Sequence, residues 1–188
     1  MYNPIIFETD KMGSFSYDLF SRLLKDRIIF LTGEINSYIS NTIVSSLLYL
    51  DNISHDDIFL YINSPGGEID QGMAIIDTIK YIKSDVVTIA IGLVASMASI
   101  VLACGAENKR MSLKNTTIMI HQPLAGFSGQ ASDMDIINKH LQFKKLLLID
   151  ILSEATKQNR NKIKQDIDRD YYLTVEEALK YRLIDKIL

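Results

Sequence analysis

The amino-acid sequence predicts an α/β fold built of stacked right-handed βαβ units. Three apolar, strand-like runs, near residues 27–33, 58–62 and 86–91, alternate with three segments whose apolar residues recur at helical spacing. This alternation is typical of parallel strands joined by right-handed helical crossovers. The chain of 188 residues is 47% hydrophobic and 23% charged, which excludes disordered, collagen-like and coiled-coil proteins. We therefore expect one folded domain over residues 1–188.

The first half of the chain supplies two of these units. After a loop around Gly13, residues 17–25 are predicted to form a short helix, and the strand that follows ends at Gly33. Apolar residues at helical spacing over residues 39–48 predict the second helix. The next strand starts at Ile58 and is almost wholly apolar.

The third unit follows the turn at residues 63–67, with a helix whose apolar stripe covers residues 69–79. The stretch 86–106 is long and uncharged enough to pass a simple test for a membrane span. We reject a membrane span because the first part is β-branched, Gly92 is expected to break it, and a small-residue-rich helix follows from about Ser96. Continuous apolar strands of this kind are typical of parallel sheets covered on both faces.

The second half of the chain has a different pattern. Short strands are predicted at residues 109–112 and 117–120, before a glycine-rich segment and a long helix over about 134–155. Ser132 and Asp133 are the candidate N-caps of this helix. Its apolar residues spread over more than one face, which fits either contact with a partner chain or a place inside the protein's own core.

The C-terminal region is predicted to hold a charged helix near Lys162, followed by a strand, a turn, a helix and a strand. Thr174 and Glu177 have the spacing of a capping box, which fixes where the last helix starts.

Charge and cysteine content narrow the function classes. Twenty basic and 23 acidic residues give a net charge of −3, and no basic cluster offers a footprint for a phosphate backbone, so nucleic acid is not expected as a partner. The single cysteine, Cys104, cannot form an intrachain disulfide, and no Cys or His residues have zinc-site spacing. We therefore expect a cytoplasmic protein with no metal and no cofactor.

Three segments have residue types that could perform chemistry. Gly66 and Gly67 stand between a strand and a helix, where free backbone N–H groups can hold an oxyanion or a phosphate. A plain turn explains these glycines equally well. No Walker sequence is present, so this turn does not indicate ATP binding.

The other two segments hold a serine and a histidine. Ser96 lies at a predicted strand-to-helix turn, where a nucleophile would gain from the helix N-terminus, although the pattern alone favours an N-cap serine. His121 ends an apolar strand, where a structural hydrogen-bond donor is the more common role. A general base would need an orienting carboxylate, and spacing does not choose among Asp77, Asp85, Asp133, Asp135, Asp166, Asp168 and Asp170.

A family resemblance chooses among these alternatives. Five blocks, in order from about residue 4 to residue 188, resemble the signature blocks of the proteolytic subunit of the Clp protease; they are SRLLKDRIIFLTGEI, LYINSPGGEIDQGMAIIDTI, ASMASIVLACGAENKRMSL, MIHQPLAGFSGQASDMDI and DRDYYLTVEEALKYRLID. The resemblance implies a serine endopeptidase with Ser96 as nucleophile, His121 as base and Asp170 as the third member of the triad. It further implies that the N–H groups of Gly67 and Met97 form the oxyanion hole.

The resemblance also implies an assembly. The family forms two stacked seven-membered rings around a chamber, with the long helix interleaving between rings, and an AAA+ ATP-dependent unfoldase delivers unfolded polypeptides. The substrate backbone would pair with Leu124, Ala125, Gly126 and Phe127. The unfoldase would dock on a pocket that includes Tyr61, Tyr81, Met111 and Leu188.

Two other functions are consistent with such a fold. A non-catalytic ring subunit could serve as a scaffold for active paralogues, but inactive relatives tend to lose the triad, which is complete here. A hydratase or isomerase of the fold-related crotonase group would also use a two-N–H oxyanion hole, but the Ser-His-Asp set argues against that class.

Overall fold

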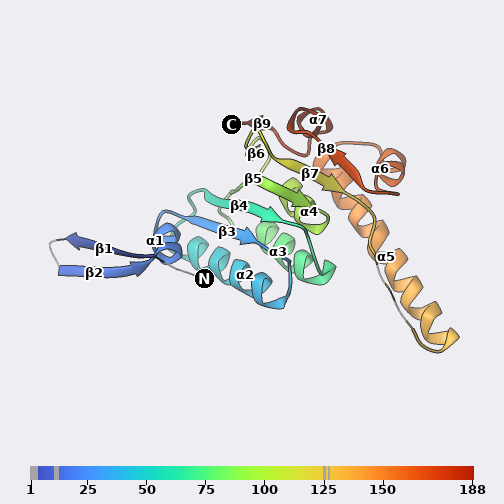
Figure 1. Ribbon diagram of the computed structural model, residues 1–188, viewed down its shortest axis with the longest axis horizontal. Coiled ribbons are helices and arrows are strands. Elements are labelled where there is room, and N and C mark those ends of the chain that lie inside the picture. The colour runs from blue at the N-terminus through green and yellow to red at the C-terminus, as the bar shows by residue number, and fades with distance from the viewer. Residues whose placement is uncertain (1–3, 11–12, 125, 127) are drawn as a thin grey trace.

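A mostly parallel β-sheet forms the centre of the protein. The computed structural model describes residues 4–10, 13–124, 126 and 128–188. The main sheet has the strand order β3-β4-β5-β6-β9, and β7 pairs with both β5 and β8. Its strands are β3 (Ile28–Thr32), β4 (Ile58–Ser64), β5 (Val86–Ala95), β6 (Arg110–Ser112), β7 (Thr117–Ile120), β8 (Tyr171–Leu173) and β9 (Lys186–Ile187). All of its strand pairs are parallel except β7–β8, so the predicted α/β class is confirmed (Figure 1).

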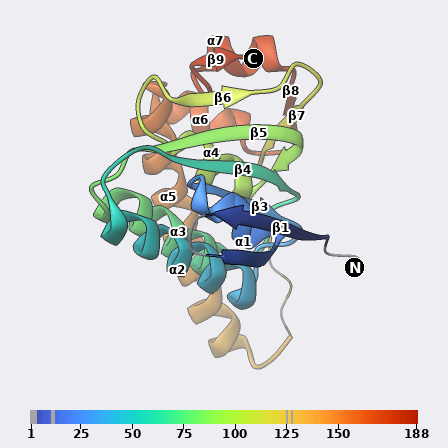
Figure 2. The same cartoon turned by 90° about the vertical axis from the view of Figure 1, so that its left-hand side faces the viewer.

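Helices connect these strands. They are α1 (Leu19–Lys25), α2 (Ser37–Ile53), α3 (Ile69–Tyr81), α4 (Met97–Ala103), α5 (Ala131–Thr156), α6 (Arg160–Asp166) and α7 (Val175–Tyr181). Helices α2 and α3 lie side by side next to the sheet, and Figure 2 shows β4, β5 and β6 stacked in order above them. The predicted stacking of βαβ units into a superhelix stays a prediction.

Burial alternates along β4. Ile58, Leu60 and Ile62 are fully buried, whereas Phe59 and Tyr61 on the opposite face stay partly exposed. Only one face of β4 is therefore fully buried, although its sequence is almost wholly apolar. The first five residues of β5, by contrast, are all buried.

Gly92 does not break β5, contrary to the expectation. The strand continues to Ala95, because the positive φ of Gly92, 63°, bends it without ending it. Before this bend β5 pairs with β6, and after it β5 pairs with β7. The bend therefore brings the end of β5 beside β7.

Two other elements differ from the expected pattern, and a third confirms it. The segment around Gly13 belongs to an antiparallel hairpin of β1 (Ile5–Asp10) and β2 (Gly13–Asp18), where a loop was expected. Helix α5 starts earlier than expected, so Ser132 and Asp133 lie in its first turn, and Gln130 occupies the N-cap position. The capping box of Thr174 and Glu177 at the start of α7 is confirmed.

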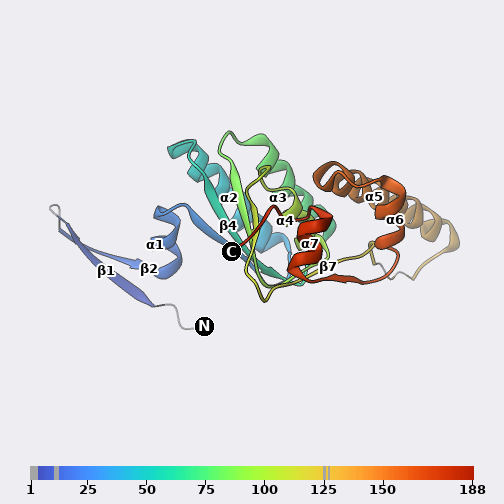
Figure 3. The same ribbon diagram turned by 90° about the horizontal axis from the view of Figure 1, so that it is seen from above.

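The first half of α5 leaves the body of the protein. Its buried residues start only at Leu148, and the ribbon of its N-terminal half points away from the sheet (Figures 1 and 3). The contact of this half with a second ring stays a prediction. No helix among the described residues combines the length and the apolar character needed to cross a bilayer.

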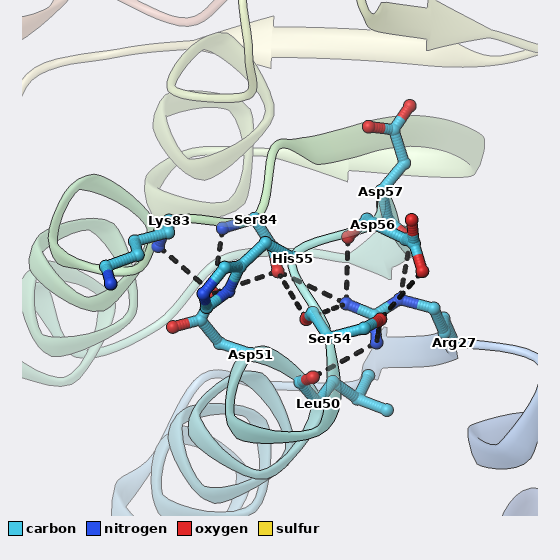
Figure 4. A network of polar contacts seen from close by, with 9 residues as sticks. All are labelled: Arg27, Leu50, Asp51, Ser54, His55, Asp56, Asp57, Lys83 and Ser84. Atoms are coloured by element: carbon cyan, nitrogen blue, oxygen red, sulfur yellow. Dashed lines mark hydrogen bonds and ion pairs between the residues drawn. The ribbon is translucent and has the colours of Figure 1, made fainter.

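A polar network holds together the edge of the sheet at which β4 and β5 begin (Figure 4). The Arg27 guanidinium donates to the backbone oxygens of Leu50 at 3.0 Å and Asp56 at 2.8 Å, so it satisfies a carbonyl at the end of α2. The Asp51 carboxylate accepts from the backbone N–H of Ser84 at 2.8 Å. This network ties the end of α2 to the segments that lead into β4 and β5.

Candidate active site

Four segments that are distant in the sequence meet where the strands end. The Gly66–Gly67 turn follows β4, and Ser96 joins β5 to α4. His121 directly follows β7, and Asp170 directly precedes β8. Because β7 and β8 are antiparallel, with Ile120 paired to Tyr171, these last two residues become neighbours.

A chain of two hydrogen bonds links the serine, the histidine and the aspartate. The distance from Ser96 Oγ to His121 Nε2 is 2.8 Å, and the distance from His121 Nδ1 to Asp170 Oδ1 is 2.9 Å. An ionised carboxylate only accepts hydrogen bonds, so Nδ1 carries the proton and Nε2 is left to accept from the serine hydroxyl. Of the seven aspartates that spacing left open, the structure brings Asp170 to His121.

The backbone of Ser96 turns its side chain toward the histidine. Ser96 occupies the N-cap position of α4, but its side chain makes no capping hydrogen bond, and its φ is 56°. Positive φ is uncommon for a residue with a side chain and often marks a functional site. The N–H of Ser96 donates to Met119 O at 2.9 Å, and the Ser99 hydroxyl donates to Ser96 O at 2.6 Å, so the strained turn is held from both sides.

The turn after β4 fits closely against Ser96. A Cβ on Gly66 would lie 2.6 Å from the Cβ of Ser96, and a Cβ on Gly67 would lie 2.3 Å from the carbonyl oxygen of Ile35. Both glycines also have positive φ, 97° and 150°. Only glycine therefore allows the backbone to approach the serine and Ile35 this closely.

Two backbone N–H groups beside Ser96 are free to bind an anionic oxygen. Among the described residues, the N–H groups of Gly67 and Met97 donate to no protein acceptor. Met97 is the first residue of α4, where an N–H group has no partner within the helix. Both residues line the same cleft as Ser96. This arrangement could stabilise the negative charge that forms on a carbonyl oxygen under attack.

The cleft has a volume of about 440 Å³. Ile69, Ile100 and Leu148 are among its apolar lining residues, and Glu34 and Glu68 line it as well. Such a cleft could hold an apolar side chain next to the serine.

The segment expected to pair with substrate is described only in part. Leu124 lines the cleft and is 78% exposed, and Gly126 is also exposed, so both are accessible to a ligand. Ala125 and Phe127 lie outside the described residues.

Sequence reasoning missed one residue next to the histidine. Gln122 accepts from Lys145 Nζ at 2.6 Å and donates to Asp168 O at 2.7 Å, so it joins α5 to the loop that holds Asp170. Its position after His121 was the only signal available.

The expected docking residues lie on several elements. Tyr61 and Met111 share one row of the sheet, because each is in register with Ile89 of β5. The N–H of Leu188 donates to Ser112 O at 2.9 Å, so the C-terminus lies at the edge of the same region. Tyr81, in contrast, is the last residue of α3 and is 81% exposed.

Cys104 does not offer a competing nucleophile. Burial raises the pKa of its thiol to about 12, so the reactive thiolate is scarce at neutral pH.

The sequence was also compared with models of protein families. A family model described as Clp protease matches residues 11–188, which include all four segments of the candidate site.

Proposed function

The chain belongs to the Clp protease family, and we propose that it is a serine endopeptidase that hydrolyses peptide bonds of unfolded polypeptides. Family membership supports a peptidase of the Clp type. The observation that carries the serine mechanism is the hydrogen-bonded chain from Ser96 through His121 to Asp170.

In the proposed acylation step, Ser96 Oγ attacks the carbonyl carbon of the scissile peptide bond and passes its proton to His121 Nε2. The carbonyl oxygen becomes an oxyanion, which accepts hydrogen bonds from the N–H groups of Gly67 and Met97. The imidazolium then gives its proton to the departing amine nitrogen as the C–N bond breaks, leaving an ester on Ser96. Asp170 accepts from Nδ1–H throughout and stabilises the imidazolium.

In the deacylation step, water attacks this ester while His121 Nε2 takes one of its protons. The second tetrahedral intermediate collapses, the carboxylic acid product leaves, and the proton on His121 returns to Ser96 Oγ. All groups of the chain are restored, so one water molecule is consumed for each peptide bond broken.

Assembly is part of the proposal. The family implies a barrel-forming oligomer that works with Clp ATPases. We place this chain, as one proteolytic domain in the cytoplasm, in two stacked seven-membered rings fed by an AAA+ unfoldase. The exposed apolar residues of α5 support a ring contact; they include Ile136, Phe143 and Leu146. Leu124 to Phe127 would pair with the substrate backbone.

Substitution of the serine tests the proposed activity. We expect Ser96→Ala to lower the rate of hydrolysis of a fluorogenic peptide by at least about 10³-fold, because the nucleophile is removed from a group of residues that act together. Ser45→Ala is a matched control, since Ser45 is an exposed serine of α2. Undiminished hydrolysis by Ser96→Ala would contradict the assignment, and a wild-type protein that cleaves nothing would favour the scaffold function.

A further inference from the structure

Two glutamates line the same cleft as Ser96 and His121. Glu34 and Glu68 are both exposed, and neither carboxylate forms an ion pair or a hydrogen bond within the described part of the chain. Both carboxylates are therefore available to a ligand in the cleft.

The backbone holds the two glutamates on either side of one bridge between their segments. Ile35 forms a parallel bridge with Gly67, in which its N–H donates to Gly66 O at 2.8 Å and its carbonyl accepts from the N–H of Glu68 at 2.9 Å. Ile35 itself is fully buried. The backbones of Glu34, which precedes Ile35, and Glu68, which follows Gly67, are therefore held by two hydrogen-bonded segments.

No cation among the described lining residues balances this charge, because the only ionisable side chains there are the two glutamates and His121. The lysines that reach toward the site from α5 already have partners. Lys144 pairs with Asp70, and Lys145 donates to Gln122 at 2.6 Å. The wall of the cleft beside Gly67 is therefore negatively charged.

We propose that Glu34 and Glu68 select peptide substrates with a lysine or arginine within two residues of the scissile bond. This inference rests on the proposed peptidase function, since the Gly67 N–H group then marks the position of the scissile carbonyl. An extended peptide advances by about 3.3 Å per residue. Glu68 directly follows Gly67, so we expect its carboxylate to reach substrate side chains one or two residues from the scissile carbonyl. A carboxylate pair favours a cationic side chain there and repels an acidic one.

Three sets of internally quenched peptides test this selection. All keep the same apolar residue directly before the scissile bond and carry Lys, Ala or Glu in turn at the second position before the bond or at the first or second position after it. We expect the best Lys peptide to have a kcat/KM about fivefold above its Ala counterpart and the Glu peptide to fall below both, as two partly exposed ion pairs allow. In E34Q/E68Q the Lys-to-Ala ratio should fall to about one, and in E34K/E68K the Glu peptide should become the preferred substrate.

The control variant is E107Q/E176Q, which changes the net charge equally at two exposed glutamates outside the cleft lining. It should keep the wild-type Lys-to-Ala ratio. Equal kcat/KM for the three peptides in the wild-type protein, or a Lys preference that survives in E34Q/E68Q, would overturn the inference while leaving the peptidase function in place.

Peptide-binding measurements test the charge selection independently of peptidase activity. Anisotropy measurements with Ser96→Ala should show the Lys peptide bound several-fold more tightly than the Ala and Glu peptides. If the wild-type protein cleaved none of them, the proposed function would fail. Tighter binding of the Lys peptide would still support the charge selection, and equal binding would overturn it.

Discussion

Asp170 decides which nitrogen of His121 holds the proton. Its carboxylate accepts from Nδ1 at 2.9 Å, which leaves Nε2 as the acceptor for the Ser96 hydroxyl. An asparagine could instead donate to Nδ1, which would put the proton on Nε2 and remove the base. We expect Asp170→Asn to lower kcat for peptide hydrolysis by about 10³-fold with an unchanged fold by circular dichroism. A decrease of less than twofold would show that Asp170 does not orient the histidine.

For single residues, the sequence predicted which residues form the candidate active site better than it predicted their geometry. The family resemblance singled out Asp170, whereas spacing could not, because His121 and Asp170 are 49 residues apart along the chain and meet only through the pairing of β7 with β8. For Ser96, pattern alone favoured an N-cap. The structure places it at that position with no capping bond and with φ of 56°, a conformation imposed by tertiary contacts and not by local sequence.

At the scale of elements, one buried arginine ties together the C-terminal part of the fold. Arg110 of β6 is 6% exposed and makes bonds of 2.8 Å and 2.5 Å to the two carboxylate oxygens of Asp185, and it donates to Ala155 O at the end of α5. Its removal would leave the Asp185 carboxylate with backbone N–H donors only and would take the guanidinium away from this carbonyl.

We expect Arg110→Ala to lower the free energy of unfolding in urea by about 3 kcal/mol, the lower end of the range for breaking a buried pair. Arg160→Ala is the control, because Arg160 and Asp150 form an exposed pair whose loss should cost less than about 1 kcal/mol. Equal costs for the two variants would contradict the role of Arg110.

This stabilisation should depend on pH. Burial tends to raise the pKa of Asp185, but its hydrogen bonds with Arg110 outweigh this effect and hold the pKa below its usual value. A carboxyl group with a lowered pKa in the folded protein stabilises the fold when ionised, and this contribution is lost as pH falls through that pKa. The difference between wild type and Arg110→Ala should therefore be constant near neutral pH and shrink in acid.

Element boundaries were predictable where a local cause fixes them. The capping box at Thr174 and Glu177 is such a case. Gly92 was misjudged because a glycine within an apolar run can either end a strand or bend it, and here pairing with both β4 and β7 keeps the strand intact. The β1–β2 hairpin was missed because each strand has only six residues. Phe15 and Tyr17 of β2 do alternate with polar residues, but two such positions are too few to distinguish a strand from a loop.

At the scale of the whole molecule, one face of the sheet remains incompletely covered. Tyr61 stacks on Phe30 at a ring-centroid distance of 5.4 Å and shares its row with Met111, on the face opposite the buried side chains of β4. Half-exposed aromatic side chains of this kind often dominate an interface. The sequence suggested a docking role for these residues only through the family resemblance, since pattern alone would place Tyr61 and Met111 in the core.

We predict that Tyr61→Ala stops ATP-dependent degradation of a folded substrate, because its unfoldase loses an apolar anchor, while short-peptide hydrolysis continues. Both rates are measured with the partner unfoldase and ATP present, and the oligomeric state is checked by sedimentation. Loss of both activities in an intact oligomer would show that Tyr61 serves the peptidase site and not docking.

The most direct test of the central claim is reaction with a fluorophosphonate probe followed by peptide mapping. If Ser96 is a nucleophile activated by His121, a single covalent adduct should appear on Ser96 as fluoride leaves. The adduct should be absent in Ser96→Ala and much slower to form in His121→Ala. A native protein with no adduct on Ser96, or an adduct that forms at the same rate without His121, would contradict the account.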